Sequence, residues 1–277
     1  EDTLNGAGGD DVLFGGAGVD SLNGGDGADV IYTGVADGSI DLINGGIGQD
    51  WVYYGGMSLL GLTLNAASSI EIFNAQGSSV FGTKSGNVFD VSGLLNYSNG
   101  NSFELLGGAD TFVGSEQGEL VHGGKGMDTL NGNGGADVLY GAAGIDSISG
   151  GGGSDQLYTG VADGSIDVFN GGSAVDTVVY GGMTMDGLML TNAENVENFN
   201  AQGSGVFGTK YGNVFDVSGI LSYTFGTTFY LGGGADAFVG SRVAEVVQGG
   251  KGGDTLYGNG GADSLHGGEG IDILRGG

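Results

Sequence analysis

An acidic residue recurs at a spacing of nine residues through most of this 277-residue chain. A glycine-rich stretch precedes each acid and an aliphatic residue follows two positions later, as in GGAGVDSLN (15–23) and GGDGADVIY (24–32). A three-residue insertion precedes two of the acids, at positions 41 and 167. The acidic positions are Asp2, Asp11, Asp20, Asp29, Asp41, Asp50, Asp110, Glu119, Asp128, Asp137, Asp146, Asp155, Asp167, Asp176, Asp236, Glu245, Asp254, Asp263 and Asp272.

This regularity decides between order and disorder. The chain has 67 glycines and a net charge of −27, a composition that by itself is typical of a disordered segment. Apolar residues make up 39% of the chain, and their placement is periodic. The periodic placement therefore excludes a plain flexible linker.

A second repeat is 126 residues long. YTGVADGSID occurs identically at 32–41 and 158–167, and GNVFDVSG occurs at 86–93 and 212–219. The sequence therefore predicts a first module at 1–126, a second at 127–252 and the start of a third at 253–277. In the first module, nonapeptide runs at 1–53 and 107–126 flank a stretch at 53–106 without the acidic repeat. The second module has the same layout.

The stretches without the acidic repeat keep a period of their own. Phe73, Phe81 and Phe89 are eight residues apart, as are their counterparts Phe199, Phe207 and Phe215. We interpret these stretches as further coils of the same structure that lack the acidic loops. The alternative is a small, separate β domain docked between the nonapeptide runs.

Each nonapeptide has a flexible half and an apolar half. Glycine at positions one, two and four permits a tight turn, and the last three residues alternate as a short strand with position eight inward. Two nonapeptides then form an 18-residue coil, and stacked coils form parallel sheets. The sequence therefore predicts an all-β solenoid, extended as one continuous elongated rod. Its core is only one residue deep per strand, so we expect another source of stability.

The acidic residues provide that source. Residues n and n+18 lie above one another about 4.8 Å apart, so Asp11 stacks over Asp29, and Asp128 over Asp146. By the same rule, Asp137 stacks over Asp155, and Asp254 over Asp272. Stacked carboxylates repel each other unless a divalent cation lies between them. Carboxylate and carbonyl oxygens without Cys or His ligands select Ca²⁺.

Charge and composition exclude several function classes. With 33 acidic and 6 basic residues, nucleic acid and anionic membranes are poor partners, whereas cations are good ones. No apolar run approaches the length that crosses a membrane, so we expect no membrane insertion. His122 and His266 stand at position nine, on the outer face, and no nucleophile pairs with them in both modules. We therefore expect no enzymatic activity.

The pattern GGxGxDxUx, where U is a large aliphatic residue, strongly resembles the RTX, or hemolysin-type, calcium-binding repeat. The resemblance implies a right-handed parallel β-roll that becomes ordered on binding calcium, here about 7–13 ions. In that family, each ion takes carbonyls at positions one and three with the Asp of one loop, and carbonyls at positions two and four with the Asp of the next. Carried over, the carboxylate ligands are all the acidic positions above except Asp2, Glu119 and Glu245. The implied carbonyl ligands are those of Gly15, Gly16, Ala17, Gly18, Gly24, Gly25, Gly27, Gly123, Gly124, Lys125, Gly126, Gly249, Gly250, Lys251 and Gly252.

Some loops depart from the pattern. GSEQGE before Glu119 and GSRVAE before Glu245 lack the glycines, so we expect weak or empty sites there. Asp37 and Asp163 lie in the inserted loops at 33–41 and 159–167 and either add a ligand or face solvent. Replacing Asp137 with Ala should therefore affect calcium binding more than the same change at Glu119.

Three functions remain open. The first is a calcium-ordered structural region of a large exported adhesin, surface-layer (S-layer) or matrix protein, which the 126-residue duplication favours. The others are the calcium-binding accessory region of an exported protease, lipase or toxin, and a lectin-like or ice-binding adhesin module. The resemblance implies type I export from a Gram-negative bacterium to the cell surface or medium. The chain begins without Met and is expected to be part of a longer protein, with neighbouring repeats or end-to-end self-association as candidate contacts. Without calcium we expect it to be largely unfolded.

Overall fold

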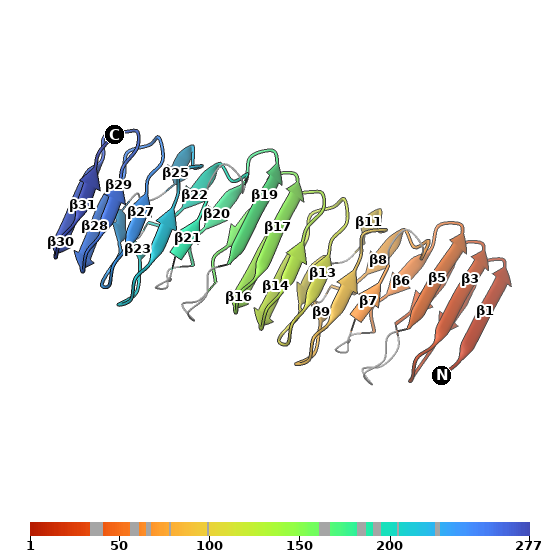
Figure 1. Cartoon of the computed structure of the whole chain (residues 1–277). Coiled ribbons are helices and arrows are strands. Elements are labelled where there is room, and N and C mark those ends of the chain that lie inside the picture. Colours follow the sequence, from red (N-terminus) through yellow and green to blue (C-terminus); the bar gives the residue numbers. More distant parts are fainter. Residues whose placement is uncertain are drawn as a thin grey trace. The chain divides into compact units, whose positions relative to one another are not determined.

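The computed structural model describes residues 1–33, 41–55, 61–64, 68–77, 79–98, 100–160, 167–181, 187–190, 195–203, 205–224 and 228–277. They form two compact units, Glu1–Leu139 (unit 1) and Tyr140–Gly277 (unit 2). All the regular elements of these residues are β-strands (Figure 1). No helix long and apolar enough to cross a membrane occurs among them. Asp37 and Asp163 lie outside the described residues.

Unit 1 contains short strands of two to six residues. They are β1 (Thr3–Gly8), β2 (Val12–Phe14), β3 (Ser21–Asp26), β4 (Val30–Tyr32), β5 (Leu42–Ile47), β6 (Trp51–Tyr53), β7 (Gly61–Thr63), β8 (Ile72–Asn74), β9 (Val80–Phe81), β10 (Val88–Asp90), β11 (Asn96–Tyr97), β12 (Ser102–Glu104), β13 (Thr111–Val113), β14 (Leu120–Lys125) and β15 (Thr129–Asn131). The strand β16 (Val138–Ala143) contains the boundary between the units.

Unit 2 repeats this arrangement of short strands. They are β17 (Ser147–Gly152), β18 (Gln156–Tyr158), β19 (Val168–Ser173), β20 (Thr177–Val179), β21 (Gly187–Met189), β22 (Asn198–Asn200), β23 (Val206–Phe207), β24 (Val214–Asp216), β25 (Ser222–Thr224), β26 (Thr228–Tyr230), β27 (Ala237–Val239), β28 (Val246–Lys251), β29 (Thr255–Tyr257), β30 (Ser264–Glu269) and β31 (Ile273–Arg275).

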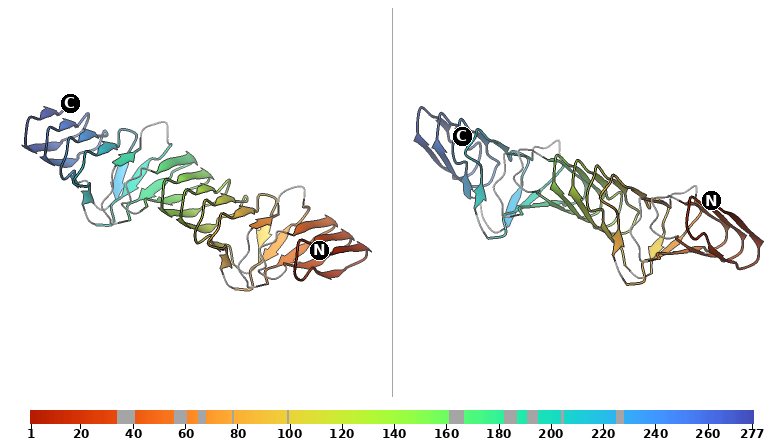
Figure 2. Two further views of the ribbon diagram at one scale, coloured as in Figure 1. Left: turned by 60° about the horizontal axis from the view of Figure 1, so that its bottom comes forward. Right: turned by 90° about the horizontal axis from the view of Figure 1, so that it is seen from below.

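The strands pair in parallel, and consecutive strands belong to different sheets. In unit 1 the sheet orders are β1-β3-β5, β2-β4-β6-β8-β11, β7-β10-β13-β15 and β9-β12-β14. In unit 2 they are β17-β19, β18-β20-β22-β25, β21-β24-β27-β29-β31 and β23-β26-β28-β30. The chain of each unit therefore winds from sheet to sheet (Figure 2). The predicted all-β, parallel solenoid is confirmed, whereas the module boundaries and the continuity of one rod stay predictions.

Coil length varies with the sequence. Thr3 pairs with Ser21, a coil of 18 residues, and Ser21 pairs with Leu42, which includes the three-residue insertion. Where the acidic repeat is missing, Val88 pairs with Thr111 and with Gly61, so the coils there are longer. These pairs show that described strands of the stretch at 53–106 continue the parallel pairing of the neighbouring coils.

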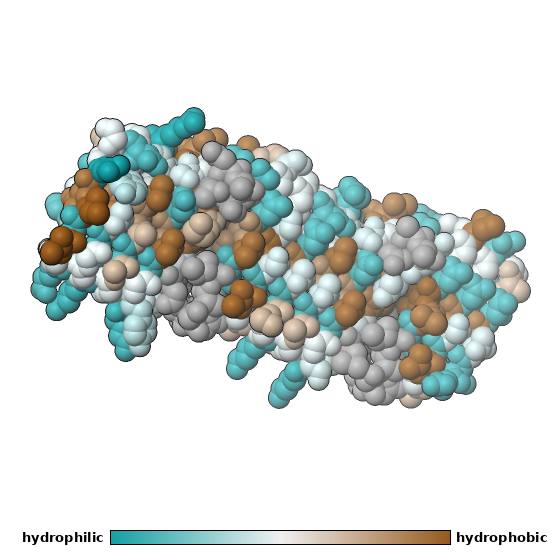
Figure 3. All heavy atoms as spheres, viewed as in Figure 1, coloured by the Kyte–Doolittle hydropathy of each residue, from teal (hydrophilic) through white to brown (hydrophobic). Residues whose placement is uncertain are grey.

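In most of the three-residue strands the core contains one inward side chain, as predicted, although β8 buries all three of its residues and β31 none. Leu13 and Ile31 are buried at position eight, while their strand neighbours are more exposed. On the face drawn in Figure 3, exposed apolar side chains lie among hydrophilic ones in each unit.

The eight-residue phenylalanine period is not a structural period. Phe73 and Phe89 are fully buried, but Phe81 is 40% exposed, and the residue before it, Val80, fills the core position. Phe207 is likewise exposed in unit 2. An eight-residue step places Phe81 on the outer side of β9, because neighbouring residues of a strand face opposite sides.

Candidate metal centres

The acid at position six ends each glycine-rich turn, and most of these acids are buried. Asp29 and Asp50 are fully buried. Asp29 Oδ1 accepts a hydrogen bond from the Asp11 N–H at 2.8 Å, and Asp50 Oδ1 accepts one from the Asp29 N–H at 2.8 Å. One carboxylate oxygen therefore links each coil to the coil before it.

The same bond recurs through both units, at 2.6–3.0 Å, and forms a ladder of carboxylates along the turns. Its acceptors are Asp20, Asp29, Asp41, Asp50, Asp110, Asp128, Asp137, Asp167, Asp176, Asp236, Asp254, Asp263 and Asp272. The sequence predicted stacked carboxylates but not that one oxygen of each is already bonded to the backbone.

The second oxygen of many of these carboxylates is different. It is buried and has no hydrogen-bond partner among the described residues of the chain. These oxygens are Oδ2 of Asp11, Asp20, Asp29, Asp50, Asp110, Asp176, Asp236, Asp254 and Asp263, and Oε2 of Glu119 and Glu245 is in the same state. A buried carboxylate oxygen without a partner is costly, so each needs a proton or a cation.

The glycine at position one completes this environment. A Cβ atom built on Gly24 would collide with Asp29 Oδ2 and with the carbonyl oxygen of Gly45 in the next coil. Gly249 stands in the same relation to Asp254 Oδ2 and the Gly267 carbonyl. Oxygen atoms of two coils therefore converge beside a residue that cannot carry a side chain. This all-oxygen donor set fits Ca²⁺.

Glycines at positions two and four also allow close stacking. Gly25 and Gly27 have φ of 113° and 142°, a region that side chains disfavour. A Cβ on Gly27 would collide with the Gly9 carbonyl of the preceding coil. The turn carbonyls of successive coils are thus closely stacked, as the resemblance implies, although the individual carbonyl ligands stay predictions.

Burial also changes the acidity of the ladder. It raises the pKa of Asp128 to about 6, while the hydrogen bond from the Asp110 N–H opposes this and the charge of Asp110 adds to it. Burial likewise raises the pKa of Asp176 to about 6. The pKa values of Asp50 and Asp236 are raised for the same reason. The charged carboxylates are therefore disfavoured until a cation compensates them.

The carboxylates do not gather into larger clusters. Over the described ranges, no group of three or more His, Asp or Glu side chains is placed to hold a metal. A metal centre at these turns would therefore have few carboxylates and would need other oxygen ligands, for which the sharing of carbonyls between neighbouring turns stays a prediction.

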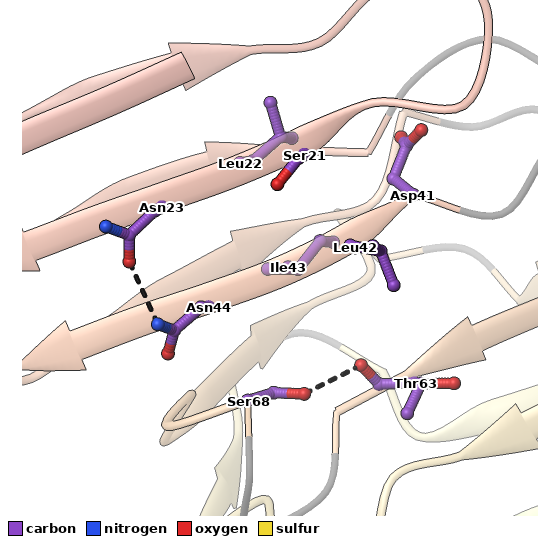
Figure 4. A pocket seen from close by; sticks show the side chains of 9 residues that line it. All are labelled: Ser21, Leu22, Asn23, Asp41, Leu42, Ile43, Asn44, Thr63 and Ser68. Carbon is purple, nitrogen blue, oxygen red and sulfur yellow. Dashed lines mark hydrogen bonds between the residues drawn. The ribbon is translucent and has the colours of Figure 1, made fainter. Parts of the chain in front are cut away.

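Asp41, which follows the three-residue insertion in the sequence, keeps its place in the ladder. Asp41 lies beside the start of β3, next to Ser21 and a cavity of about 290 Å³ (Figure 4). Its Oδ1 accepts the Asp20 N–H at 3.0 Å. On the outer face, Asn44 Nδ2 donates to Asn23 Oδ1 at 2.9 Å. The inserted residues thus leave the ladder position of Asp41 unchanged.

Sequence reasoning missed four members of the ladder. Glu71 Oε2 accepts the Asp50 N–H at 2.8 Å, and Glu197 Oε2 accepts the Asp176 N–H at 2.9 Å. Asn87 and Asn213 occupy the coil positions before Asp110 and Asp236. The stretches therefore do not lack acidic turns entirely, which corrects the prediction. The signal was present, because Glu71 follows Asp50 by the same 21 residues that separate Asp41 from Asp20.

Comparison with known proteins agrees with these turns. The family described as the RTX calcium-binding nonapeptide repeat matches residues 1–31, 105–139, 113–148, 122–157, 131–166 and 239–274. No curated protein matches the chain. The matched segments contain regular turns together with those of Glu119 and Glu245, and they leave out most of the two stretches without the acidic repeat. The chain therefore carries the calcium-binding repeats of the RTX family.

Proposed function

We propose that this chain is a calcium-ordered structural repeat region of a large exported surface protein, such as an adhesin, S-layer or matrix protein. The observation that carries the proposal is the recurring set of buried carboxylate oxygens without a partner among the described residues. Calcium at these turns would compensate the buried charge and join successive coils.

The net charge supports the same role. The chain carries −27, and about 12 divalent ions would reduce this to roughly −3. Self-repulsion would then nearly vanish, so folding and calcium binding would be one process. Export into a calcium-rich medium, by the type I route that the resemblance implies, fits this coupling.

A structural role, and not catalysis, is favoured by the sameness of the acidic residues. Each ladder carboxylate makes the same bond to the preceding coil, whereas a catalytic pair is expected to differ from its neighbours. The two units also repeat each other in detail, since Glu71 and Glu197 make equivalent bonds. Repeated units of this kind suit a protein that spans distance or forms a lattice.

Circular dichroism with chelator and then with calcium tests the proposal. We expect the β signal to fall strongly in chelator and to return with a midpoint near 10⁻⁴–10⁻³ M calcium, or tighter through cooperativity. Magnesium at the same concentration is the control and should restore less, because its octahedral geometry is stricter. A β spectrum undiminished by chelator would contradict the proposal.

A further inference from the structure

Four turns of the chain carry Ser or Thr at position two, which the regular turns do not. We call them the hydroxyl turns: Gly82–Asn87 and Gly114–Glu119 in unit 1, and Gly208–Asn213 and Gly240–Glu245 in unit 2. At position six they carry Asn or Glu in place of Asp. The four turns belong to the described residues, and they lie in the middle segments, which we define as 68–122 of unit 1 and 195–248 of unit 2.

The hydroxyl residue bonds the side chain at position six of its own turn. The Thr83 N–H and Oγ1 both donate to Asn87 Oδ1 at 3.0 Å. In the second turn, Ser115 Oγ donates to Glu119 Oε1 at 2.5 Å, and Tyr97 donates to the same oxygen at 2.8 Å. An oxygen at position six is therefore satisfied by donors of the protein itself.

Unit 2 repeats these bonds. The Thr209 N–H and Oγ1 donate to Asn213 Oδ1 at 3.1 and 3.0 Å. The Ser241 N–H donates to Glu245 Oε1 at 3.0 Å, and Tyr223 donates to this oxygen at 2.8 Å. The bonds thus belong to the repeated unit.

In the asparagine turns, a side-chain amide nitrogen bonds two oxygens of the turn in the next coil. Asn87 Nδ2 donates to the Leu105 carbonyl at 3.0 Å and to Asp110 Oδ1 at 2.7 Å. Leu105 is position one, and Asp110 position six, of the turn in the next coil. Asn213 Nδ2 bonds the Leu231 carbonyl and Asp236 Oδ1 in the same way, both at 2.9 Å.

The glutamate turns use an amide from the next coil. Asn133 Nδ2 donates to the Gly114 carbonyl, position one of the Glu119 turn, at 2.7 Å. Asn259 Nδ2 donates to the Gly240 carbonyl at the same distance. In all four hydroxyl turns, side-chain groups therefore bond part of the oxygens that a cation would need. In the two glutamate turns, however, Oε2 of Glu119 and of Glu245 is still buried without a partner among the described residues, so only the asparagine turns lack such an oxygen.

We propose, building on the calcium-dependent function proposed above, that the hydroxyl turns Gly82–Asn87 and Gly208–Asn213 bind no calcium and that the middle segments stay folded without it. Asn87 and Asn213, together with the hydroxyls of Thr83 and Thr209, then exclude the ion from these two turns. The middle segments also have an aromatic core that does not depend on a metal. The Phe103 ring lies 4.9 Å from that of Phe112, and the Phe229 ring lies 4.9 Å from that of Phe238.

Converting a hydroxyl turn into a regular one tests this directly. Thr83→Gly with Asn87→Asp removes the bonding hydroxyl and amide and restores glycine at position two and Asp at position six. We expect equilibrium dialysis to count about one additional bound calcium for this variant and again for Thr209→Gly with Asn213→Asp. Gln117→Glu is the matched control, because it adds one exposed negative charge to a hydroxyl turn and leaves its bonds intact. It should add no ion.

Folded double variants that bind no additional calcium would overturn the inference. If the double variants do not fold in calcium, the inference is tested by digesting the unaltered chain with a non-specific protease in chelator. Fragments from 68–122 and 195–248 should survive, and their loss as fast as that of the regular turns would overturn the inference. Failure of the proposed function is a different result, in which the unaltered chain binds no calcium or chelator leaves the regular turns resistant.

Discussion

Unit 1 contains two regions built on the same coil by different chemistry. In the first run of regular turns, the inward side chains are aliphatic, such as Leu22, Ile31 and Val52. In the middle segment they include Phe89 and Phe103. A buried phenylalanine removes more apolar surface from water and adds ring–ring contacts, so the middle segment has the larger hydrophobic term.

The turns of the two regions also differ, in how the side-chain oxygens at position six are bonded. Asp29 and Asp50 leave one buried oxygen without a partner among the described residues, whereas Asn87 Oδ1 is bonded by Thr83. The regular run therefore combines a thin core with uncompensated charge. The middle segment combines a larger core with a hydrogen-bonded asparagine turn, although Asp110 and Glu119 within it each keep one buried oxygen without a partner among the described residues. The comparison indicates that one backbone can be stabilised either by a cation or by its own side chains.

The largest expected effect separates the two cores. Phe103→Ala should destabilise the chain by about 3–5 kcal/mol, because the cavity lies among Phe73, Phe89 and Phe112. In chelator, the β signal that remains should come from the middle segments. Phe103→Ala should abolish this signal, whereas Leu22→Ala should leave it unchanged. Phe81→Ala is the control for side-chain size and should change stability by less than about 0.5 kcal/mol, because Phe81 is partly exposed. If Phe103→Ala and Leu22→Ala reduced the β signal in chelator equally, the two regions would not differ in their dependence on calcium.

The second effect concerns the two kinds of turn. Asp137→Ala should raise the calcium midpoint and lower the cooperativity, because neighbouring coils order together. Glu119→Ala should change the midpoint little but destabilise the calcium-free chain by about 1–3 kcal/mol, since Tyr97 and Ser115 lose their acceptor. Calcium and denaturant titrations measure both effects.

A matched variant isolates the charge of Asp137. Asp137→Asn keeps an acceptor for the Glu119 N–H, which lies 2.7 Å from Asp137 Oδ1, and removes only the charge. It should still raise the calcium midpoint. Equal midpoint shifts for Glu119→Ala and Asp137→Ala would mean that the glutamate turn binds calcium like a regular one.

The smallest expected effect is a pH dependence of reversed sign in chelator. Burial raises the pKa of Asp110 and Asp236, which lie in the middle segments, above the usual value near 4 of an unfolded chain. The folded middle segments then bind more protons than the unfolded chain above about pH 4, so their stability falls as pH rises from there. Denaturant midpoints at pH 4.5 and 7 measure this, with Asp110→Asn and Asp236→Asn together as the control that weakens it. A calcium-free chain that is more stable at pH 7 would contradict the account.

The nonapeptide period predicted the strands, the inward position eight and the acidic turns, because each depends on a few neighbouring residues. It did not predict that Asp29 Oδ1 accepts a hydrogen bond from the Asp11 N–H, since that bond depends on how closely the coils stack. The bond between Tyr97 and Glu119 was also missed. It joins residues 22 apart, and the length of the irregular coils cannot be read from a nine-residue period. Asn87 was missed because Asn in a glycine turn is common without any metal-related role.

Hydrogen exchange with and without calcium most directly tests whether calcium stabilises the regular turns and side chains stabilise the hydroxyl turns. The backbone N–H groups of Asp11 and Asp29 donate to carboxylates of regular turns. The backbone N–H of Asn87 donates to Asp110 Oδ1, which also accepts a hydrogen bond from the Asn87 side-chain Nδ2. In calcium, all three should be protected. In chelator, the Asp11 and Asp29 amides should exchange like those of an unstructured peptide, while the Asn87 amide stays protected. Loss of protection at all three in chelator, or retention at all three, would contradict the account.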